Sequence, residues 1–433
     1  MSRFNLDGII SWIDSHIIDY PTAMNLNYNW SFGAAAGFCL VIQILSGSFL
    51  AMHYVSDTHY AFSSIEHIMR DVKGGWLIRY IHSNGASLFF IVVYAHIFRG
   101  LYFGSFMEPR QQLWWSGGVI YILMMATAFI GYVLPWGQMS FWGATVITSL
   151  FSILPSVGRE VVMWIWGGFT VGNPTLNRFY SLHYFLPFLI SGLVFFHLGL
   201  LHKEGSNNPL GFRTRIGNLS FYPYLYAKDL VSLFILLSLL SIIVFYFPNT
   251  LGDPDNYLEA DPYGTPAHIV PEWYFLPFYA ILRVIPNKVG GILTMAGAIG
   301  VIFLYPVLNI SKLRSGNFRP IYSVGFWLFL CDFFLLAWSG TTPVDDYFII
   351  IGVIVSLSYF LFFFVGSLVV GFLEKEFLFR LRELRAIGEI LWQNTGFISQ
   401  VFELFLHTFI LKLFPKRIGE EKYCALLYPK KVI

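Results

Sequence analysis

The sequence predicts an all-α integral membrane protein with eight transmembrane helices, and its composition, hydrophobic runs and charge distribution each lead to that fold class. Of the 433 residues, 56% are hydrophobic, 19% are aromatic and only 12% are charged. A soluble chain of this length needs far more charge to stay in solution. The net charge of +2 gives no reason to expect a nucleic-acid partner. Membrane lipid is the expected surrounding.

Eight stretches of the chain each hold about 20 mainly apolar residues, the number that a helix needs to cross a hydrocarbon core of ~30 Å. They cover residues 30–53, 76–101, 113–134, 179–201, 230–247, 289–310, 321–340 and 347–372. With the N-terminus placed inside, the loops and helix ends on that side hold most of the 27 Lys and Arg residues. This excess favours an even number of spans with both termini inside.

The segments outside the spans carry weaker signals. Residues 135–178 and 248–287 are long connections that can hold short surface helices over a site. Residues 1–20 predict an amphipathic helix in the membrane interface rather than a signal peptide. Its apolar side chains fall at helical spacing: Phe4, Leu6, Ile9, Ile10, Ile13 and Ile17. The apolar patch at 401–414 is too short to span, so we expect an amphipathic or partner-binding tail there.

Four histidines repeat at equal intervals on two of the predicted spans. The second span carries His82 and His96 and the fourth carries His183 and His197, so that both pairs are 14 residues apart. Fourteen helical steps return a side chain to within ~40° of its direction after a rise of ~21 Å. If the two helices face each other, the imidazoles form two pairs, and each pair can ligate one iron from both sides. Such ligation leaves iron no open position and suits electron transfer.

The alternative is that these histidines hydrogen-bond across the helix bundle, as polar side chains do in membranes. Burying four ionisable groups at one repeated spacing is costly, which favours the haem interpretation. The three cysteines are Cys39, Cys331 and Cys424, and they form no CxxC or CxxCH motif. A haem would therefore be held non-covalently, and any iron–sulfur cluster would belong to a partner.

Four glycines repeat the histidine spacing. Gly33 and Gly47 on the first span, and Gly117 and Gly131 on the third, are also 14 residues apart. A flat porphyrin wedged between helices needs residues without a Cβ where a backbone approaches its edge. The alternative is ordinary packing of small residues between membrane helices.

Two arginines lie three residues from a candidate ligand, near the ends of the second span. Arg79 precedes His82 and Arg99 follows His96. Guanidinium groups at these positions can pair with haem propionates. The alternative is that both side chains extend to the membrane interface.

A carboxylate stands in the motif Pro271-Glu272-Trp273-Tyr274, in a long outer loop before a span. Glu272 has aromatic and proline neighbours that solvate it poorly. Its pKa should therefore rise, and it could accept a proton near neutral pH. The alternative is an ordinary interface residue.

A second polar group lies at the inner side, where the fourth span ends and the fifth begins. It comprises His202, Lys203, Glu204, Ser206, Lys228 and Asp229. These side chains could supply protons to a quinone that is reduced on the inside. The alternative is anchoring, or a favourable interaction of charges with a helix terminus.

Several runs of sequence closely resemble the cytochrome b family, the central subunits of ubiquinol–cytochrome c oxidoreductase. The similarity extends over about residues 20–380. The runs are RYIHSNGAS at 79–87, GQMSFWGATVIT at 137–148, NPTLNRFYSLHY at 173–184, HKEGSNNPLG at 202–211, GDPDNY at 252–257 and PEWYFLPFYAILR at 271–283.

The resemblance implies specific roles for the residues above. His82 and His183 would ligate a low-potential haem near the outer face, and His96 and His197 a high-potential haem near the inner face. At an outer quinol-oxidation site Glu272 would accept a proton, in a pocket shaped by Tyr279, Met139 and Gly143. An inner quinone-reduction site would use His202, Ser206, Lys228 and Asp229.

The resemblance also implies partners and a location. A Rieske iron–sulfur protein would take one electron from each ubiquinol, and a membrane-anchored c-type cytochrome and other complex III subunits would complete a dimeric assembly. The chain would be a catalytic subunit that works only within that complex and moves protons across the membrane. The expected location is the mitochondrial inner membrane, with a bacterial membrane as the alternative.

We expect three parts of the chain. Residues 1–210 would form a four-helix haem-binding domain, 211–380 a second four-helix domain and 381–433 a C-terminal extension. The sequence departs from the family pattern at Tyr222, where His is usual, and at Ala267 and Val270, where Pro and Lys are usual. Residues 386–433 extend beyond the usual end.

Two other functions compete with this interpretation. A histidine-lined transporter or proton channel without haem would be colourless when purified. Other two-haem, quinone-linked membrane subunits are shorter than this chain, and they lack the motif at 271–274.

Overall fold

The structure is a computed structural model that describes residues 8, 11, 14–212 and 217–394. The chain divides into two compact units, Met1–Val370 and Gly371–Ile433. The predicted amphipathic helix at 1–20 lies mostly outside the described residues, and only a short π-helix, η1 (Asp14–Ile18), is seen there. The predicted apolar patch at 401–414 lies wholly outside them.

The described residues are mainly helical. The α-helices are α2 (Phe32–Ala51), α3 (Ala61–Arg70), α4 (Gly75–Phe103), α5 (Gln111–Val133), α6 (Gln138–Ser149), α7 (Gly158–Trp166), α8 (Asn173–Glu204), α9 (Tyr224–Tyr246), α10 (Leu276–Arg283), α11 (Lys288–Leu308), α12 (Pro320–Thr341), α13 (Asp346–Phe364) and α14 (Val370–Asn394). Further single turns are η2 (Tyr28–Ser31), η3 (Leu150–Ile153), η4 (Pro254–Tyr257), η5 (Trp273–Phe275), η6 (Gly316–Phe318) and η7 (Val365–Val369). Two short antiparallel strands, β1 (Pro21–Ala23) and β2 (Asn218–Ser220), join the N-terminal segment to the chain before α9.

The prediction of an all-α protein with eight spans is confirmed. Within the described residues eight helices are long and apolar enough to cross a membrane. Their outward faces carry large apolar side chains, such as Phe195 and Phe234, which are 76% and 72% exposed. Such faces are stable against lipid, because helices satisfy their own backbone hydrogen bonds there.

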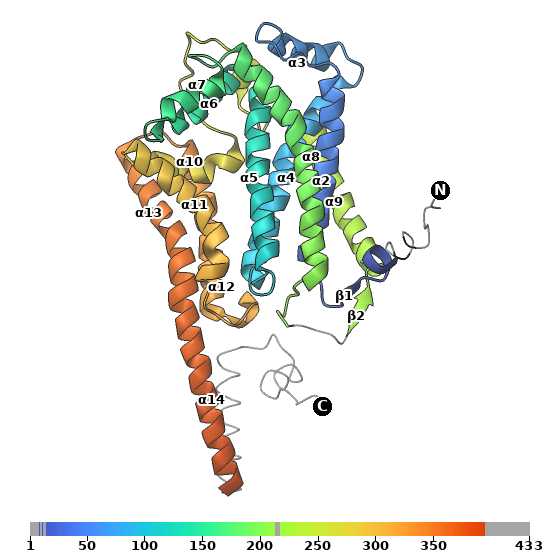
Figure 1. Ribbon diagram of the computed structural model, residues 1–433, viewed down its shortest axis with the longest axis vertical. Coiled ribbons are helices and arrows are strands. Elements are labelled where there is room, and N and C mark those ends of the chain that lie inside the picture. Colours follow the sequence, from blue (N-terminus) through green and yellow to red (C-terminus); the bar gives the residue numbers. More distant parts are fainter. Residues whose placement is uncertain (1–7, 9–10, 12–13, 213–216, 395–433) are drawn as a thin grey trace. The chain divides into compact units, whose positions relative to one another are not determined.

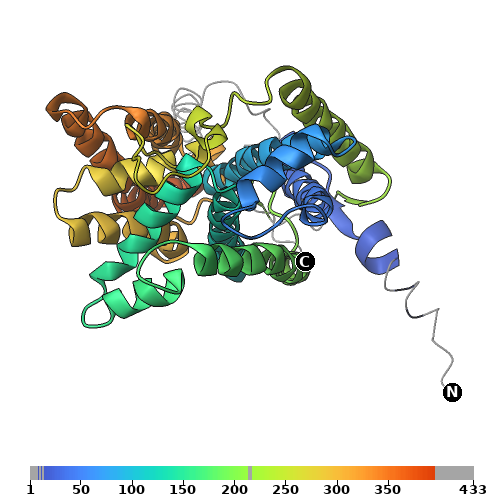
Figure 2. The same ribbon diagram turned by 90° about the horizontal axis from the view of Figure 1, so that it is seen from above.

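Four long helices form the part of the first unit that holds the candidate site. Helix α2 packs against α4 and α5 packs against α8, while α2 also touches α8. Figures 1 and 2 show these four helices side by side. Helix α4 ends at Phe103, and the next residue, Gly104, closes it with a φ of 66°, a left-handed conformation that favours glycine.

The long connections do contain short helices. Residues 135–178 include α6, η3 and α7, and residues 248–287 include η4, η5 and α10. Helix α10 packs on α11 and α12. The segment with Glu272 leads directly into η5 and α10. Through α10 it is attached to α11 and α12, and Trp273 contacts Ser87 of α4.

Candidate functional site

Each of the four repeated glycines faces one of the four histidines. Neighbouring helices run antiparallel, so a 14-residue step on one matches a 14-residue step on the other. The pairs are Gly47 with His82, Gly33 with His96, Gly131 with His183 and Gly117 with His197. The missing Cβ therefore leaves room for an imidazole of the adjacent helix. The close approach to a porphyrin edge stays a prediction.

The histidines form two layers, an outer layer of His82 and His183 and an inner layer of His96 and His197. The space beside each glycine differs between these two layers. A Cβ on Gly47 would lie 2.9 Å from Cε1 of His82, and a Cβ on Gly131 would overlap the ring of His183. At the other layer the corresponding distances are 3.3 Å for Gly33 and 3.1 Å for Gly117. Separations under 3 Å require something to move, so the layer of His82 and His183 is the tighter one.

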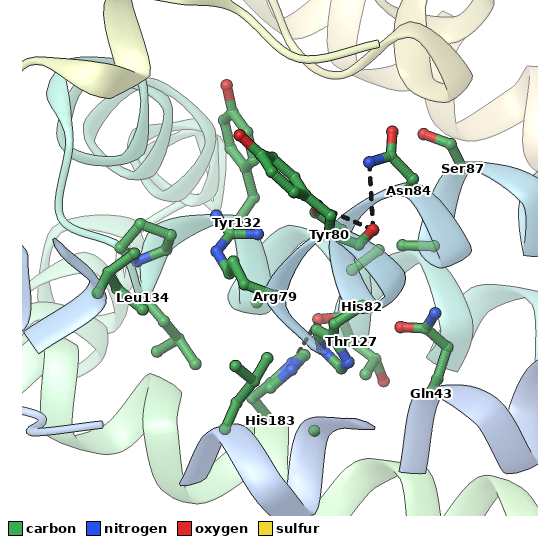
Figure 3. A pocket seen from close by; sticks show the side chains of 18 of the residues that line it. Gln43, Arg79, Tyr80, His82, Asn84, Ser87, Thr127, Tyr132, Leu134 and His183 are labelled. Atoms are coloured by element: carbon green, nitrogen blue, oxygen red, sulfur yellow. Dashed lines mark hydrogen bonds between the residues drawn. The ribbon is translucent and has the colours of Figure 1, made fainter. Parts of the chain in front are cut away.

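The rings of His82 and His183 lie next to each other (Figure 3). Their centroids are 6.2 Å apart and their planes are nearly perpendicular, at 84°. A metal bonded to both imidazoles, with bonds of ~2 Å each, would hold the two centroids ~6 Å apart. The spacing therefore fits one iron between the rings.

Hydrogen bonds at Nδ1 leave Nε2 of His82 and His183 available. His183 Nδ1 lies 2.9 Å from the carbonyl of Thr127, which can only accept, so Nδ1 carries the proton. His82 Nδ1 lies 2.9 Å from Ser46 Oγ, whose own hydrogen is donated to the carbonyl of Ile42 at 2.6 Å. With Nδ1–H donating in both rings, Nε2 keeps its lone pair for a metal.

The second layer is built differently at its two histidines. His197 Nδ1 lies 2.8 Å from Ser116 Oγ, which donates to Leu113, so Nε2 is again the free acceptor. Arg99 Nη2, by contrast, donates to Nδ1 of His96 at 2.8 Å. A ring that accepts at Nδ1 carries its proton at Nε2. Arg99 must therefore release this nitrogen before His96 can ligate a metal.

Two buried donors beside this second layer have no hydrogen-bond partner. They are Nε of Arg99 and Nε1 of Trp30, whose side chains pack with the guanidinium carbon 5.4 Å from the indole ring. His96 and His197 lie close enough to interact electrostatically. Unpaired buried donors next to two imidazoles fit a cofactor that brings acidic groups as well as a metal.

A cavity of ≈ 560 Å³ joins the outer histidine pair to the Glu272 segment. Its volume falls within the range of cofactor sites. It is lined by His82 and His183 with their glycines, and by Arg79, Tyr132 and Glu272. Figure 3 shows the two histidines, Arg79 and Tyr132 in this cavity. The structure thus brings together the predicted ligands, the predicted arginine and the predicted proton acceptor.

Glu272 lies near Arg79 of α4, Tyr132 of α5 and Asp253, the residue before η4. Burial, followed by the nearby Asp253 carboxylate, raises the pKa of Glu272 to about 7, although Arg79 and the Tyr132 hydroxyl act to lower it. A carboxyl group with this pKa can take up and release a proton near neutral pH.

The other outer residues lie apart from this cavity. Met139 and Gly143 are on α6 and Tyr279 is on α10, and the cavity lining includes none of the three. Met139 is buried, at 1% exposed, and Tyr279 donates its hydroxyl to the carbonyl of Ile269 at 3.4 Å. Their role in shaping a quinol pocket stays a prediction.

The inner candidate residues contact the N-terminal segment of the chain. The ring of His202 stacks on Tyr20 with centroids 4.3 Å apart, and its Nδ1 lies 3.3 Å from Nδ1 of His16. Lys228 Nζ donates to the carbonyl of Asn27 at 3.1 Å. These contacts bring the end of α8 and the start of α9 to one segment.

Asp229 and Ser206 lie in the same region. Asp229 faces Ser31 of η2. Ser206 contributes its backbone carbonyl, which accepts from Arg110 Nη2 at 3.3 Å, next to Gly205, whose carbonyl accepts from Arg110 Nε at 2.7 Å.

Sequence reasoning missed the residues that support the predicted ones. The Nδ1 partners Ser46 and Ser116 each precede a repeated glycine, so the dipeptides at 46–47 and 116–117 were a usable signal. The contacts of Tyr20 and His16 with His202 had no comparable signal, because they depend on how the N-terminal segment folds back.

Comparisons with known proteins agree with this geometry. The family described as cytochrome b/b6/petB matches residues 17–205, and cytochrome b(C-terminal)/b6/petD matches 259–360. Cytochrome b of Phytophthora megasperma is 60% identical over 81% of this chain and 92% of its own length. Cytochrome b of Marchantia polymorpha is 59% identical over 82% of this chain and 88% of its own.

A solved structure is similar as well. A chain of a hyperthermophilic respiratory complex III superposes with a TM-score of 0.79 at 32% identity, over 84% of this chain and 99% of that one. Because matched profiles cover most of the sequence and relatives share well over half of their residues, the chain belongs to the cytochrome b family, as a multi-pass, haem b-binding, electron-transferring subunit of complex III, the quinol–cytochrome c oxidoreductase.

Proposed function

We propose that the chain binds two non-covalent b haems, one at each histidine layer, and carries electrons between an outer quinol-oxidation site and an inner quinone-reduction site. The observation that carries the proposal is the outer pair, whose facing rings are 6.2 Å apart and whose Nδ1 atoms both have oxygen partners. When bound, the haems supply a one-electron path across the membrane. His82 and His183 hold the low-potential haem, and His96 and His197 the high-potential haem.

At the outer site the chain handles the proton. Glu272 lines the cavity that also contains the outer histidines, and its pKa of about 7 lets it receive a proton from a quinol. Arg79 lines the same cavity, where its guanidinium is placed to pair with a haem propionate. Met139, Gly143 and Tyr279, which do not line this cavity, shape the quinol pocket.

At the inner site the chain supplies protons to a quinone. His202 has an imidazole partner in His16 and a stacked ring in Tyr20. Lys228 and Asp229 provide a cation and a carboxylate at the start of α9. Ser206 completes the set of groups that can hold the quinone oxygen.

We propose further that the chain is a catalytic subunit of a dimeric complex with a Rieske iron–sulfur protein and a c-type cytochrome as partners, ubiquinol as substrate and proton translocation as outcome. The proposed location is the mitochondrial inner membrane, which the eukaryotic sources of the relatives support. Residues 1–210 would form the haem domain, 211–380 a second membrane domain and 381–433 an extension.

Haem content tests the proposal most directly. In the purified complex, chemical extraction and redox titration should give two b haems per copy of this chain, with two separate midpoint potentials. A colourless chain would support the histidine-lined transporter instead. A single haem would overturn the assignment of two layers.

The Glu272→Gln variant tests the outer site. Because the carboxylate must be deprotonated to accept a proton, quinol oxidation should rise as pH increases through about 7 and level off above it. The variant should lower the rate by ~10²-fold and flatten this profile, with both haem bands unchanged. A profile that still rises through neutral pH in the variant would exclude Glu272 as acceptor.

The His202→Leu variant tests the inner site. Without the imidazole, reoxidation of the inner haem by quinone should slow by roughly tenfold or more, while quinol oxidation by the outer site stays normal in a single turnover. Flash-induced haem kinetics would measure both steps. Reoxidation at the normal rate would remove His202 from the inner site.

A further inference from the structure

The segment that follows Glu272, residues 273–275, contacts helix α4. It contacts a different side of this helix from the side that carries the histidines. The contacting residues are Ser87, Phe90 and Tyr94. At 100° per residue, these three lie roughly 80–140° around the helix from His82. One helix therefore connects the outer histidine pair and the proposed proton acceptor.

The first contact is a chain of two hydroxyl groups. Tyr121 of α5 donates to the hydroxyl of Tyr94 at 3.1 Å, and Tyr94 donates to the backbone carbonyl of Tyr274 at 2.5 Å. All three residues are buried, with exposed fractions between 3% and 7%. Hydrogen bonds in such a chain polarise and strengthen one another in a low-dielectric interior.

The second and third contacts fix the aromatic residues of the segment. Trp273 Nε1 donates to Ser87 Oγ at 3.0 Å. The rings of Phe90 and Tyr274 stack almost in parallel, with centroids 3.9 Å apart and planes at 2°. Together with the hydroxyl chain, these contacts attach two consecutive residues directly after Glu272 to α4.

The segment has little regular structure of its own to hold it. Residues 273–275 form a single turn, which the amide of Phe275 closes by donating to the carbonyl of Glu272 at 2.9 Å. A buried carbonyl such as that of Tyr274 needs a donor, and Tyr94 is the donor that the structure gives it. The position of the Glu272 backbone therefore depends on these contacts.

We propose that Tyr94, supported by Tyr121, is a positioning residue for quinol oxidation: its hydroxyl anchors the carbonyl of Tyr274 and so holds Glu272 in the cavity beside the outer histidines. This inference rests on the proposed function of Glu272. Tyr94 touches neither the histidines nor Glu272 through a hydrogen bond in the structure, and it acts through the segment.

The Tyr94→Phe variant in the intact complex tests the anchor. Loss of the hydroxyl should lower the rate of quinol oxidation by roughly tenfold, because small displacements of a reacting group are costly. A loosened segment admits water to Glu272, while Asp253, Arg79 and Tyr132 remain in place. The midpoint of the pH profile should therefore move down, toward the ordinary range of a carboxyl group.

Two further variants separate anchoring from general destabilisation. Tyr121→Phe leaves the bond between Tyr94 and Tyr274 intact and should have a smaller effect in the same direction. Tyr322→Phe is the matched control, because Tyr322 is also buried and donates to a backbone carbonyl of α4, that of Leu101, at 2.9 Å. It should leave rate and midpoint unchanged. Both haem bands should persist in all three variants.

The double variant Tyr94→Phe with Glu272→Gln decides whether Tyr94 acts through Glu272. If it does, the double variant should be no slower than Glu272→Gln alone. Multiplied losses, or a Tyr94→Phe complex with normal rate and midpoint, would overturn the anchor while a flat profile in Glu272→Gln still supports the proton acceptor. If Glu272→Gln itself changes nothing, both the acceptor and the anchor are wrong.

Discussion

The two histidine layers share a spacing but differ in how their rings are held. In the outer layer both rings donate from Nδ1 to oxygen atoms, those of Ser46 and Thr127. In the inner layer only His197 does so, because His96 accepts from Arg99 instead. Three of the four rings are thus ready to ligate through Nε2, and the fourth is paired with a guanidinium.

The layers also differ in the room around the rings. The outer glycines leave less than 3 Å between an added Cβ and the imidazole, whereas the inner ones leave 3.1 Å and 3.3 Å. The outer layer is therefore the more tightly packed one, and the inner layer is the one in which a guanidinium contacts an imidazole. Steric changes should damage the outer layer most, and changes of charge the inner layer.

The largest effect is expected from removing an outer ligand. His183→Leu should abolish the proposed outer haem, because only one of the two imidazoles that would hold it, that of His82, remains. Reduced-minus-oxidised spectra should show loss of one b band and retention of the inner one. His59→Ala is the control, since the His59 side chain is 85% exposed beside Asp57. Two intact bands in His183→Leu would contradict the pairing.

A smaller and layer-specific effect is expected at the glycines. Gly131→Ala places a methyl group into the ring of His183. Overpacking of ~1–3 kcal/mol corresponds to a ~5- to 150-fold loss of affinity for the outer haem. Gly33→Ala meets His96 only at 3.3 Å and should cost less than ~5-fold at the inner haem. Haem occupancy of the two purified variants measures this. Equal losses would show that the layers are packed alike.

The smallest effect is expected from the charge at the inner layer. Arg99→Gln removes a cation beside His96. Because a nearby positive charge favours the reduced haem, its removal stabilises the oxidised haem relative to the reduced one. The inner midpoint potential should fall by ~60 mV, the equivalent of a tenfold change for one electron, with the haem retained. Arg79→Gln is the matched variant and should shift the outer haem instead. A potential of the inner haem that does not move would leave Arg99 without an electrostatic role.

The fold was largely predictable, because each span carries its own hydrophobic signal. The limits of the helices were less so. The fourth span is predicted at 179–201, whereas α8 runs from Asn173 to Glu204. Hydropathy reports the part of a helix that faces lipid, and the polar first turn with Pro174 is helical outside that part.

The candidate site was predictable where a repeat revealed it. The histidine and glycine spacings identify faces of helices, yet they do not say which glycine meets which histidine. That register depends on α2 running antiparallel to α4 and α5 to α8. The anchor of the Glu272 segment by Tyr94 was beyond the sequence for the same reason, since it joins residues 180 positions apart.

On the proposed path through two haems, the 14-residue step also sets how strongly electron transfer is coupled to the membrane voltage. A rise of ~21 Å along helices that cross a core of ~30 Å means that an electron passing from one layer to the other traverses about two thirds of the insulating layer. At ~2.3 kcal/mol per charge and 100 mV for a full crossing, this transfer is coupled to the membrane voltage by ~1.5 kcal/mol per 100 mV. A voltage that is negative inside opposes this inward electron transfer. Because the histidine pairs are separated along the membrane normal, the redox step does work against the voltage and charges the membrane.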